Sequence, residues 1–264
     1  MIKMVATDID GTILRWNKGF SPAVKACIRD LCSRGIKVVL VTGRMHCSAV
    51  FLAKELGLDT PIVSYQGGMI KENSLNGAVY YNKYLNPLYA EQIINWAKEH
   101  NIHLNLYMDD ILYVECDDET AKNYTEARQI KYQVCNFNDL KLEKINKILA
   151  IDYENADRVS DWVRDLSKKF QELYIVKSTP YFCEISHPDA KKSTAIKYLC
   201  KRWGFEKEEV LTIGDQNNDI ELLKAGGIAV AMGNATEELK SCACYITDTV
   251  ENDGFVKAVE KFCK

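Results

Sequence analysis

Two aspartates separated by a single residue open the part of the chain that could carry chemistry. Asp8 and Asp10 lie in the segment DIDGT at residues 8–12, directly after the short apolar run of residues 4–7. Their i, i+2 spacing points both side chains the same way while the chain stays extended. Gly11 then allows the backbone to leave the strand abruptly. An isolated Asp-x-Asp is also common in loops and helix caps, so this segment needs support from other parts of the sequence.

Two more polar clusters follow apolar runs in the same way. The first is TGR at residues 42–44, and the second is GDQNND at residues 214–219. In an open α/β sheet the carboxyl ends of the strands form one edge, and ligands bind in the crevice there. We therefore expect three clusters that are distant in sequence to meet in space.

The charges in these clusters call for compensation. Asp8, Asp10 and Asp215 would place three carboxylates at one edge. Two like charges about 4 Å apart repel by ~4 kcal/mol at an effective dielectric constant near 20, so three pairs cost on the order of 10 kcal/mol. A bound cation or a raised carboxylate pKa must offset this. Oxygen ligands without a histidine or thiol cluster favour Mg²⁺ over zinc.

Other ligand-binding motifs do not fit the sequence. The segment 214–219 begins like a calcium loop, but Ile220 stands where that loop needs glycine and Gly226 where it needs glutamate. No GxGxxG or GxxxxGK[ST] stretch occurs, which argues against dinucleotide and P-loop sites.

The elements around the clusters alternate between strand and helix. In the first segment we expect strands at 4–7, 36–41 and 61–65, with helices beginning at Ser21 and spanning 45–56. In the last segment we expect helices at 192–203, 220–224 and 236–241, alternating with strands at 210–213, 228–232 and 244–247. This order predicts a Rossmann-like α/β core with a parallel sheet.

The middle of the chain reads differently. A helix is expected at 86–100, and strands at 103–108 and 111–116 are joined by Asp109 and Asp110. Strands at 172–177 and 181–185 form a second hairpin. We therefore predict two domains, a catalytic core of residues 1–83 and 188–264 and an inserted α+β domain of residues 84–187.

Composition narrows the class of partner. The net charge is −3, which gives no basic field for a nucleic acid, and no segment approaches the apolar length of a membrane span. The start of the sequence does not resemble a secretory signal, so we expect a cytoplasmic protein whose ten cysteines are reduced thiols. A small-molecule partner is expected, with a monomer as the default state.

The motifs together resemble those of the haloacid dehalogenase superfamily of phosphotransferases. The segment 8–12 matches its first motif, DxDGT, while residues 42–44 and 214–219 resemble its second and fourth motifs. The third motif is a lysine that opens a helix, for which Lys191 and Lys192 are both candidates and the spacing favours Lys192. The insert is similar to the type IIB cap of Cof-like phosphatases, which selects the substrate. One departure is Gln66, where the group commonly has asparagine.

The resemblance implies a reaction. Asp8 would attack the phosphoryl group and form an aspartyl-phosphate, and Asp10 would protonate the leaving oxygen and later activate water. Mg²⁺ would be held by Asp8, the backbone carbonyl of Asp10, and Asp215. Because dehalogenases of the superfamily lack the second aspartate, Asp10 favours a phosphate ester as the substrate.

The resemblance also implies binding residues. Four would bind the phosphoryl group: Thr42, Gly43, Lys192 and Asn218. Asp219 would orient Lys192 or a metal-bound water. The candidate substrate contacts are Arg44, Gln66 and Gly67. The expected substrate is a small phosphorylated metabolite, a sugar phosphate or a similar monoester.

Two alternative functions remain open. A sugar phosphomutase shares DxDGT and a similar cap, but it needs an arginine cluster, and this insert has only Arg128, Arg158 and Arg164, widely spaced. A non-catalytic binding protein would not need both Asp8 and Asp10. His46 is expected on the surface of a helix, with contact to the substrate as the alternative.

Overall fold

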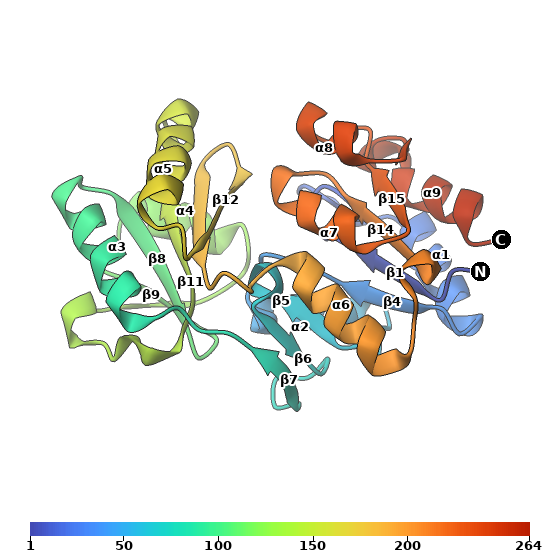
Figure 1. The fold of residues 1–264 in the computed structure, drawn as a ribbon, viewed down its shortest axis with the longest axis horizontal. Coiled ribbons are helices and arrows are strands. Elements are labelled where there is room, and N and C mark those ends of the chain that lie inside the picture. Colours follow the sequence, from blue (N-terminus) through green and yellow to red (C-terminus); the bar gives the residue numbers. More distant parts are fainter. The chain divides into compact units, whose positions relative to one another are not determined.

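The computed structural model describes residues 1–264 and divides the chain into two compact units (Figure 1). The core unit comprises residues Met1–Tyr80 and Lys191–Lys264, and the inserted unit comprises Tyr81–Ala190. Each unit has its own hydrophobic core. The α/β class with an inserted α+β unit, expected from the sequence, is confirmed.

The core unit is built on a parallel sheet of five strands in the order β16-β15-β14-β1-β4. Their bounds are β1 (Met4–Thr7), β4 (Lys37–Leu40), β14 (Val210–Gly214), β15 (Ile228–Ala231) and β16 (Tyr245–Ile246). The interior strand β1 has four buried residues, which is expected for a parallel strand covered on both faces. Because β1 lies between β4 and β14, the segments that follow these three strands meet at one edge.

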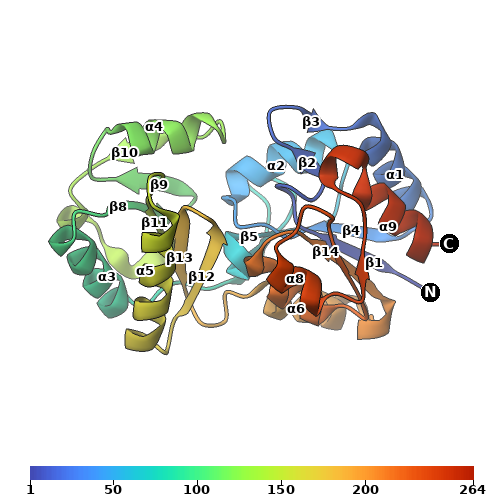
Figure 2. The same ribbon diagram turned by 90° about the horizontal axis from the view of Figure 1, so that it is seen from above.

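The helices of the core unit are α1 (Pro22–Ser33), α2 (His46–Glu55), α6 (Lys192–Trp203), α7 (Ile220–Ala225), α8 (Glu237–Cys242) and α9 (Gly254–Phe262). Figure 2 shows α1 and α9 on one side of the sheet and α6 on the other. Helix α1 begins where expected, since Ser21 caps it by accepting a hydrogen bond from the Val24 N–H and Pro22 occupies its first turn. Helix α9 was not anticipated from the sequence.

Two small sheets complete the core unit. The hairpin β2 (Leu14–Arg15) and β3 (Gly19–Phe20) follows the DIDGT segment. The strands β5 (Ile62–Ser64), β6 (Met69–Lys71) and β7 (Val79–Asn82) form a separate sheet. The strand expected at 61–65 is therefore present as β5, but it joins the main sheet only through an isolated parallel bridge between Val41 and Val63.

The inserted unit contains a mixed sheet in the order β10-β9-β8-β11-β13-β12. Its strands are β8 (His103–Met108), β9 (Ile111–Val114), β10 (Tyr132–Val134), β11 (Ile145–Ile151), β12 (Tyr174–Thr179) and β13 (Phe182–Ser186). Its helices are α3 (Pro87–Glu99), α4 (Glu119–Glu126) and α5 (Ala156–Lys169). Both hairpins expected from the sequence are antiparallel pairs, and Asp109 and Asp110 turn the first one with positive φ angles of 51° and 61°.

The two faces of this sheet differ in chemistry. One face packs on α3 and α5 through apolar side chains such as Leu106 and Ile148. Figure 2 shows α4 on the opposite side of the sheet, where the ring of Tyr124 contacts that of Tyr107 at a centroid distance of 6.4 Å. On this second face Lys147 stands beside Tyr107 in register, so the face is partly polar although it is buried.

No helix of the structure combines the length and the apolar character that crossing a membrane requires.

Candidate active site

Asp8 directly follows the carboxyl end of the interior strand β1. Its N–H donates to the carbonyl of Ile213 at 3.0 Å, so the backbone of Asp8 is still held by the neighbouring strand β14. The residue is only 6% exposed. This pairing fixes the position of the carboxylate relative to the segment that follows β14.

The segment that follows β14 supplies Asp215, whose carboxylate contacts the DIDGT loop of residues 8–12. The hydroxyl of Thr12 donates to Oδ1 of Asp215 at 2.8 Å, and Gln216 Nε2 donates to Oδ2 at 3.2 Å. Gly11 has φ +81°, and a Cβ at this position would lie 2.4 Å from Oδ2 of Asp215. Only glycine therefore allows the loop to pass this close to the carboxylate. Thr12 has a positioning role that the sequence analysis did not assign.

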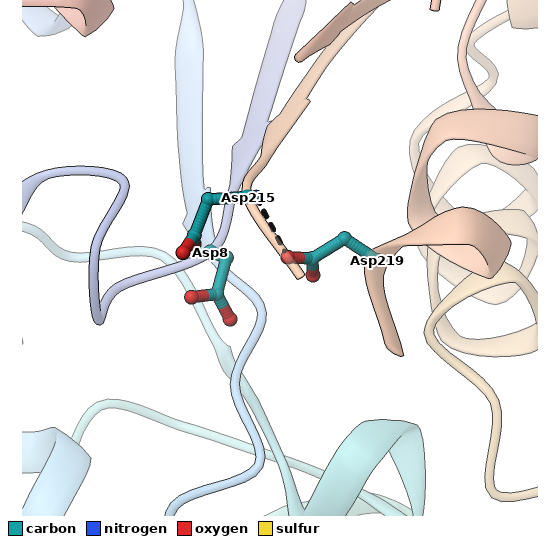
Figure 3. Close-up of side chains that lie close together, drawn as sticks. All are labelled: Asp8, Asp215 and Asp219. Atoms are coloured by element: carbon teal, nitrogen blue, oxygen red, sulfur yellow. Dashed lines mark hydrogen bonds between the residues drawn. The ribbon is translucent and has the colours of Figure 1, made fainter. Parts of the chain in front are cut away.

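Asp219 faces the same point from the short helix η5 (Asn217–Asp219). Its Oδ2 accepts hydrogen bonds from the N–H groups of Asp215 at 3.0 Å and Gln216 at 3.1 Å, while its Oδ1 faces Lys192. Asp219 thus shapes the turn after β14. Figure 3 shows the carboxylates of Asp8, Asp215 and Asp219 gathered around one point, with the bond from Asp215 to Asp219 dashed.

Lys192 connects two of these carboxylates. It opens α6, is 1% exposed, and its Nζ lies 2.5 Å from Oδ1 of Asp8 and 2.6 Å from Oδ1 of Asp219. Burial alone would lower the pKa of Lys192, but the two carboxylates raise it above its ordinary value, so the ammonium remains charged. Between the two candidate lysines, it is therefore Lys192 whose ammonium enters the site, and Lys191 is the N-cap residue of α6.

The acidic cluster carries more negative charge than one lysine balances. Burial raises the pKa of Asp8 well above its ordinary value, against the opposing effect of Lys192 and with help from the neighbouring carboxylates. Burial and the charge of Asp219 raise the pKa of Asp215 to about 7. One oxygen from each of Asp8, Asp215 and Asp219 lies within 4.8 Å of the others. These residues fit a divalent cation, because its charge would keep the buried carboxylates ionised and carboxylate oxygens are hard ligands.

The carboxylate of Asp10 has a different partner. Arg44 donates from Nε to Oδ2 at 2.7 Å and from Nη2 to Oδ1 at 2.6 Å, and its Nη1 also contacts the hydroxyl of Ser48 at 3.2 Å. Such a bidentate pair combines charge attraction with fixed geometry. Arg44 was expected to contact substrate, and in this structure its guanidinium holds Asp10.

The loop after β4 lies beside a second turn of the core unit. The hydroxyl of Thr42 accepts from the N–H of Arg44 at 3.1 Å, and Gly43 between them is half-buried. The carbonyl of Thr42 accepts from the N–H of Gln66 at 3.0 Å. Gln66 and Gly67 lie in the 3₁₀ turn η1 (Tyr65–Gly67), directly after β5.

Asn218 completes the set through a side-chain contact that the sequence did not reveal. Its Nδ2 donates to Oε1 of Gln66 at 3.0 Å, although the two residues are 152 positions apart. Asn234 is another residue without an assigned role, and its Nδ2 donates to the carbonyl of Gly11 at 2.9 Å. Segments before and after the insert therefore contact one another at the same site, as expected for clusters that follow the carboxyl ends of parallel strands.

The expectation for His46 was wrong. This residue begins α2, but its side chain is fully buried rather than on the helix surface, and its Nε2 lies 3.1 Å from the carbonyl of Ser74. The loop that connects β6 and β7 covers this end of the helix, a long-range contact that helical periodicity does not report.

The fold and the site define a known class of protein. Residues 5–259 match the family model of the haloacid dehalogenase-like hydrolases, and the chain belongs to this family. Its fold is that of the subclass with the type IIB cap, since a solved sugar phosphatase of haloacid dehalogenase subclass IIB superposes with a TM-score of 0.88. That structure is 19% identical and covers 99% of each chain.

Two relatives of known type indicate which reaction this family member catalyses. A 5-amino-6-(5-phospho-D-ribitylamino)uracil phosphatase of Bacillus subtilis is 29% identical over 98% of this chain and 94% of its own length. A phosphoglycolate phosphatase of Methanothermobacter thermautotrophicus is 27% identical over 99% of both chains. The chain is thus a phosphatase of the haloacid dehalogenase type, an enzyme that hydrolyses small phosphate monoesters.

Proposed function

We propose that this phosphatase uses Mg²⁺ and hydrolyses a sugar phosphate or a similar small monoester through an aspartyl-phosphate on Asp8. The observation that carries the proposal is the placement of Lys192. Its ammonium donates a hydrogen bond to Oδ1 of Asp8. The other carboxylate oxygen, Oδ2, is the one that we propose attacks the phosphoryl group, and the fixed cation beside it would also offset charge on the transferring oxygens.

The first half of the reaction forms the covalent intermediate. Oδ2 of Asp8 attacks phosphorus, the bond between phosphorus and the ester oxygen breaks, and protonated Asp10 gives its proton to the leaving oxygen. The leaving group departs as an alcohol.

The second half regenerates the enzyme. Asp10, now ionised, takes a proton from water. The water oxygen attacks phosphorus, and the bond between phosphorus and the oxygen of Asp8 breaks. Inorganic phosphate is released and Asp10 is protonated again. The ion pair with Arg44 corresponds to the ionised form of Asp10 that this half requires.

The acidic cluster would hold the cation. Asp8 and Asp215 are the ligand residues we propose, with the backbone carbonyl of Asp10 as a third, and Asp219 positions Lys192 and the turn at Asp215. Bound there, Mg²⁺ would withdraw charge from the phosphoryl oxygens. Thr42, Gly43, Lys192 and Asn218 are the proposed phosphate-binding set.

The inserted unit is proposed to select the substrate. On the face of its sheet that does not pack on α3 and α5, Nζ of Lys147 lies 2.9 Å from Oε2 of Glu184 and 4.6 Å from the ring of Tyr107. Both charged side chains are almost fully buried. A buried ion pair contributes little net stability compared with apolar residues, so its presence suggests another role. A hydrogen-bond donor beside an acceptor suits the hydroxyl groups of a polyol. Such a substrate agrees with the similarity of the fold to a subclass IIB sugar phosphatase, and with the phosphorylated ribityl group in the substrate after which the Bacillus relative is named.

A phosphomutase is less well supported. A mutase must hold two phosphate groups, which calls for clustered arginines. In the inserted unit Arg128 lies over the ring of Tyr124 at 4.1 Å, while Arg158 and Arg164 each pair with a nearby carboxylate. These three guanidinium groups have separate partners.

A metabolite screen tests the proposal. The purified protein would be incubated with a panel of sugar phosphates, polyol phosphates and nucleotides, with Mg²⁺ or with a chelator, and released phosphate measured. We expect release from polyol or sugar monoesters that depends on Mg²⁺. Release that is equal in the chelator, or confined to nucleotides, would contradict the proposal.

A further inference from the structure

The turn that follows β5 has an unusual backbone. Tyr65, Gln66 and Gly67 have φ angles of 51°, 60° and 102°, three left-handed residues in succession. For a residue other than glycine this conformation costs roughly 1–2 kcal/mol. Such strain persists only where the surroundings enforce it, and it is concentrated at functional sites.

The surroundings that enforce it are parts of the proposed phosphate site. The N–H of Tyr65 donates to the carbonyl of Arg44 and that of Gln66 to the carbonyl of Thr42, both at 3.0 Å. On its other side the turn presses against the start of α6, where a Cβ on Gly67 would lie 2.3 Å from the carbonyl oxygen of Lys191. The position of Gln66 is therefore fixed by the loop after β4 and by the helix that carries Lys192.

The side chain held in this way has unmet hydrogen-bonding capacity. Gln66 is 1% exposed, and its Oε1 accepts from Nδ2 of Asn218. Its Nε2 is buried without a partner, and so is Oδ1 of Asn218. Each unmet buried polar group costs about 1–3 kcal/mol. The amide pair thus retains one free donor and one free acceptor inside the site.

We propose that this amide pair binds the phosphoryl group directly, with Nε2 of Gln66 as a donor to one of its oxygens. This inference rests on the proposed function and adds a phosphate-binding residue to it. A phosphate group that carries one proton has both an acceptor oxygen and a hydroxyl donor, which matches the free ends of the pair. A neutral amide adds hydrogen bonds without adding charge to a site that already contains Lys192.

Gln66→Glu is the informative variant. Glutamate has the same length and keeps an oxygen for Asn218, but it replaces the NH₂ donor with a second oxygen. We expect inorganic phosphate to bind to this variant at least tenfold more weakly than to the wild type, measured by calorimetry with Mg²⁺ present. Phosphate should also raise the melting temperature of the variant by much less than it raises that of the wild type. The control is Gln129→Glu, because Gln129 also has a left-handed φ, of 52°, but is exposed in the inserted unit; its phosphate affinity should be unchanged.

A second variant removes the donor without adding charge. Gln66→Met should also weaken phosphate binding, by about fivefold or more, and it guards against misfolding of the glutamate variant. Phosphate affinity within twofold of wild type in either folded variant would overturn the inference, because a purely structural amide would not alter the affinity. Asp8→Asn tests the proposed function separately, since turnover by that variant would refute the aspartyl-phosphate while leaving the result for Gln66 intact.

Discussion

Arg44 donates a hydrogen bond to each carboxylate oxygen of Asp10, with N–O distances of 2.7 and 2.6 Å. The guanidinium side chain is only 11% exposed, so solvent screens this pair weakly. The two hydrogen bonds therefore fix the direction of the Asp10 carboxylate.

Replacing Arg44 should slow the reaction. In Arg44→Met the carboxylate of Asp10 would lose the partner that fixes its direction, so we expect kcat to fall by about tenfold or more near pH 7. The measurement is kcat with a chromogenic phosphate ester. Arg164→Met is the control, because Arg164 forms an exposed ion pair in the inserted unit. A kcat of Arg44→Met within about twofold of the wild-type value would show that the pair does not position Asp10 for catalysis.

Removing the carboxylate of the proposed nucleophile, Asp8, should abolish turnover. Asp8→Asn keeps the shape of the side chain and weakens its contact with Lys192, but an amide oxygen does not form a stable phosphoryl adduct. We expect a decrease in kcat of at least about 10³-fold, with secondary structure retained by circular dichroism. Mass spectrometry of the wild type quenched in acid should find a phosphorylated peptide containing Asp8. A variant with more than a few per cent of wild-type kcat would disprove the assignment.

Asp215→Asn should separate stability from activity. In the metal-free protein Asp215 has a pKa raised to about 7 from 3.8, so its contribution to stability is complete below about pH 3.8 and is lost as the pH rises through 7. In a chelator, we expect the wild-type melting temperature to fall between pH 5 and 8 more steeply than that of Asp215→Asn. Equal slopes would count against a strained acidic cluster.

The same variant tests the cation. Mg²⁺ should raise the melting temperature of the wild type, because a ligand that binds only the folded state stabilises it. Asp215→Asn should lose this effect together with activity. Asp161→Asn, which alters an exposed carboxylate of the inserted unit, should behave as the wild type does in both respects. A Mg²⁺ effect that survives in Asp215→Asn would place the cation elsewhere.

The buried pair of the inserted unit should affect which substrate is used. Lys147→Met removes the ammonium and retains most of the side-chain volume, although it leaves Glu184 buried without its partner. We therefore pair it with Glu184→Gln in a double variant. We expect the double variant to lose kcat/KM for the best polyol phosphate by tenfold or more, while a small ester such as p-nitrophenyl phosphate is hydrolysed within about twofold of the wild-type rate. An equal loss for both esters would argue against substrate selection by this pair.

Much of the core fold follows from local sequence patterns. Apolar runs that end in polar clusters located β1, β4 and β14, and parallel strands bring their carboxyl ends to one edge. That rule is sufficient to predict that Asp8 and Asp215 lie near each other. Serine followed by proline at residues 21 and 22, and glycine at 204, likewise located the ends of α1 and α6.

The pairings inside the site could not be inferred in this way. The contact of Arg44 with Asp10 and that of Gln66 with Asn218 depend on side-chain directions across loops, and no periodicity encodes them. The left-handed backbone conformation of Gln66 could not be predicted from the sequence either, because that conformation usually occurs at glycine. His46 was misplaced for a related reason, since a distant loop rather than its own helix buries it.

The position of β1 between β4 and β14 has a consequence for synthesis of the protein. The strand that precedes Asp8 pairs with β4, which the ribosome makes soon afterwards, and with β14, which follows only after the whole inserted unit has been made. The lysine that meets Asp8 is likewise 184 residues downstream. A nascent chain therefore carries Asp8 through most of translation before β14 and Lys192 are available to it, and we expect phosphatase activity only once its last third has emerged.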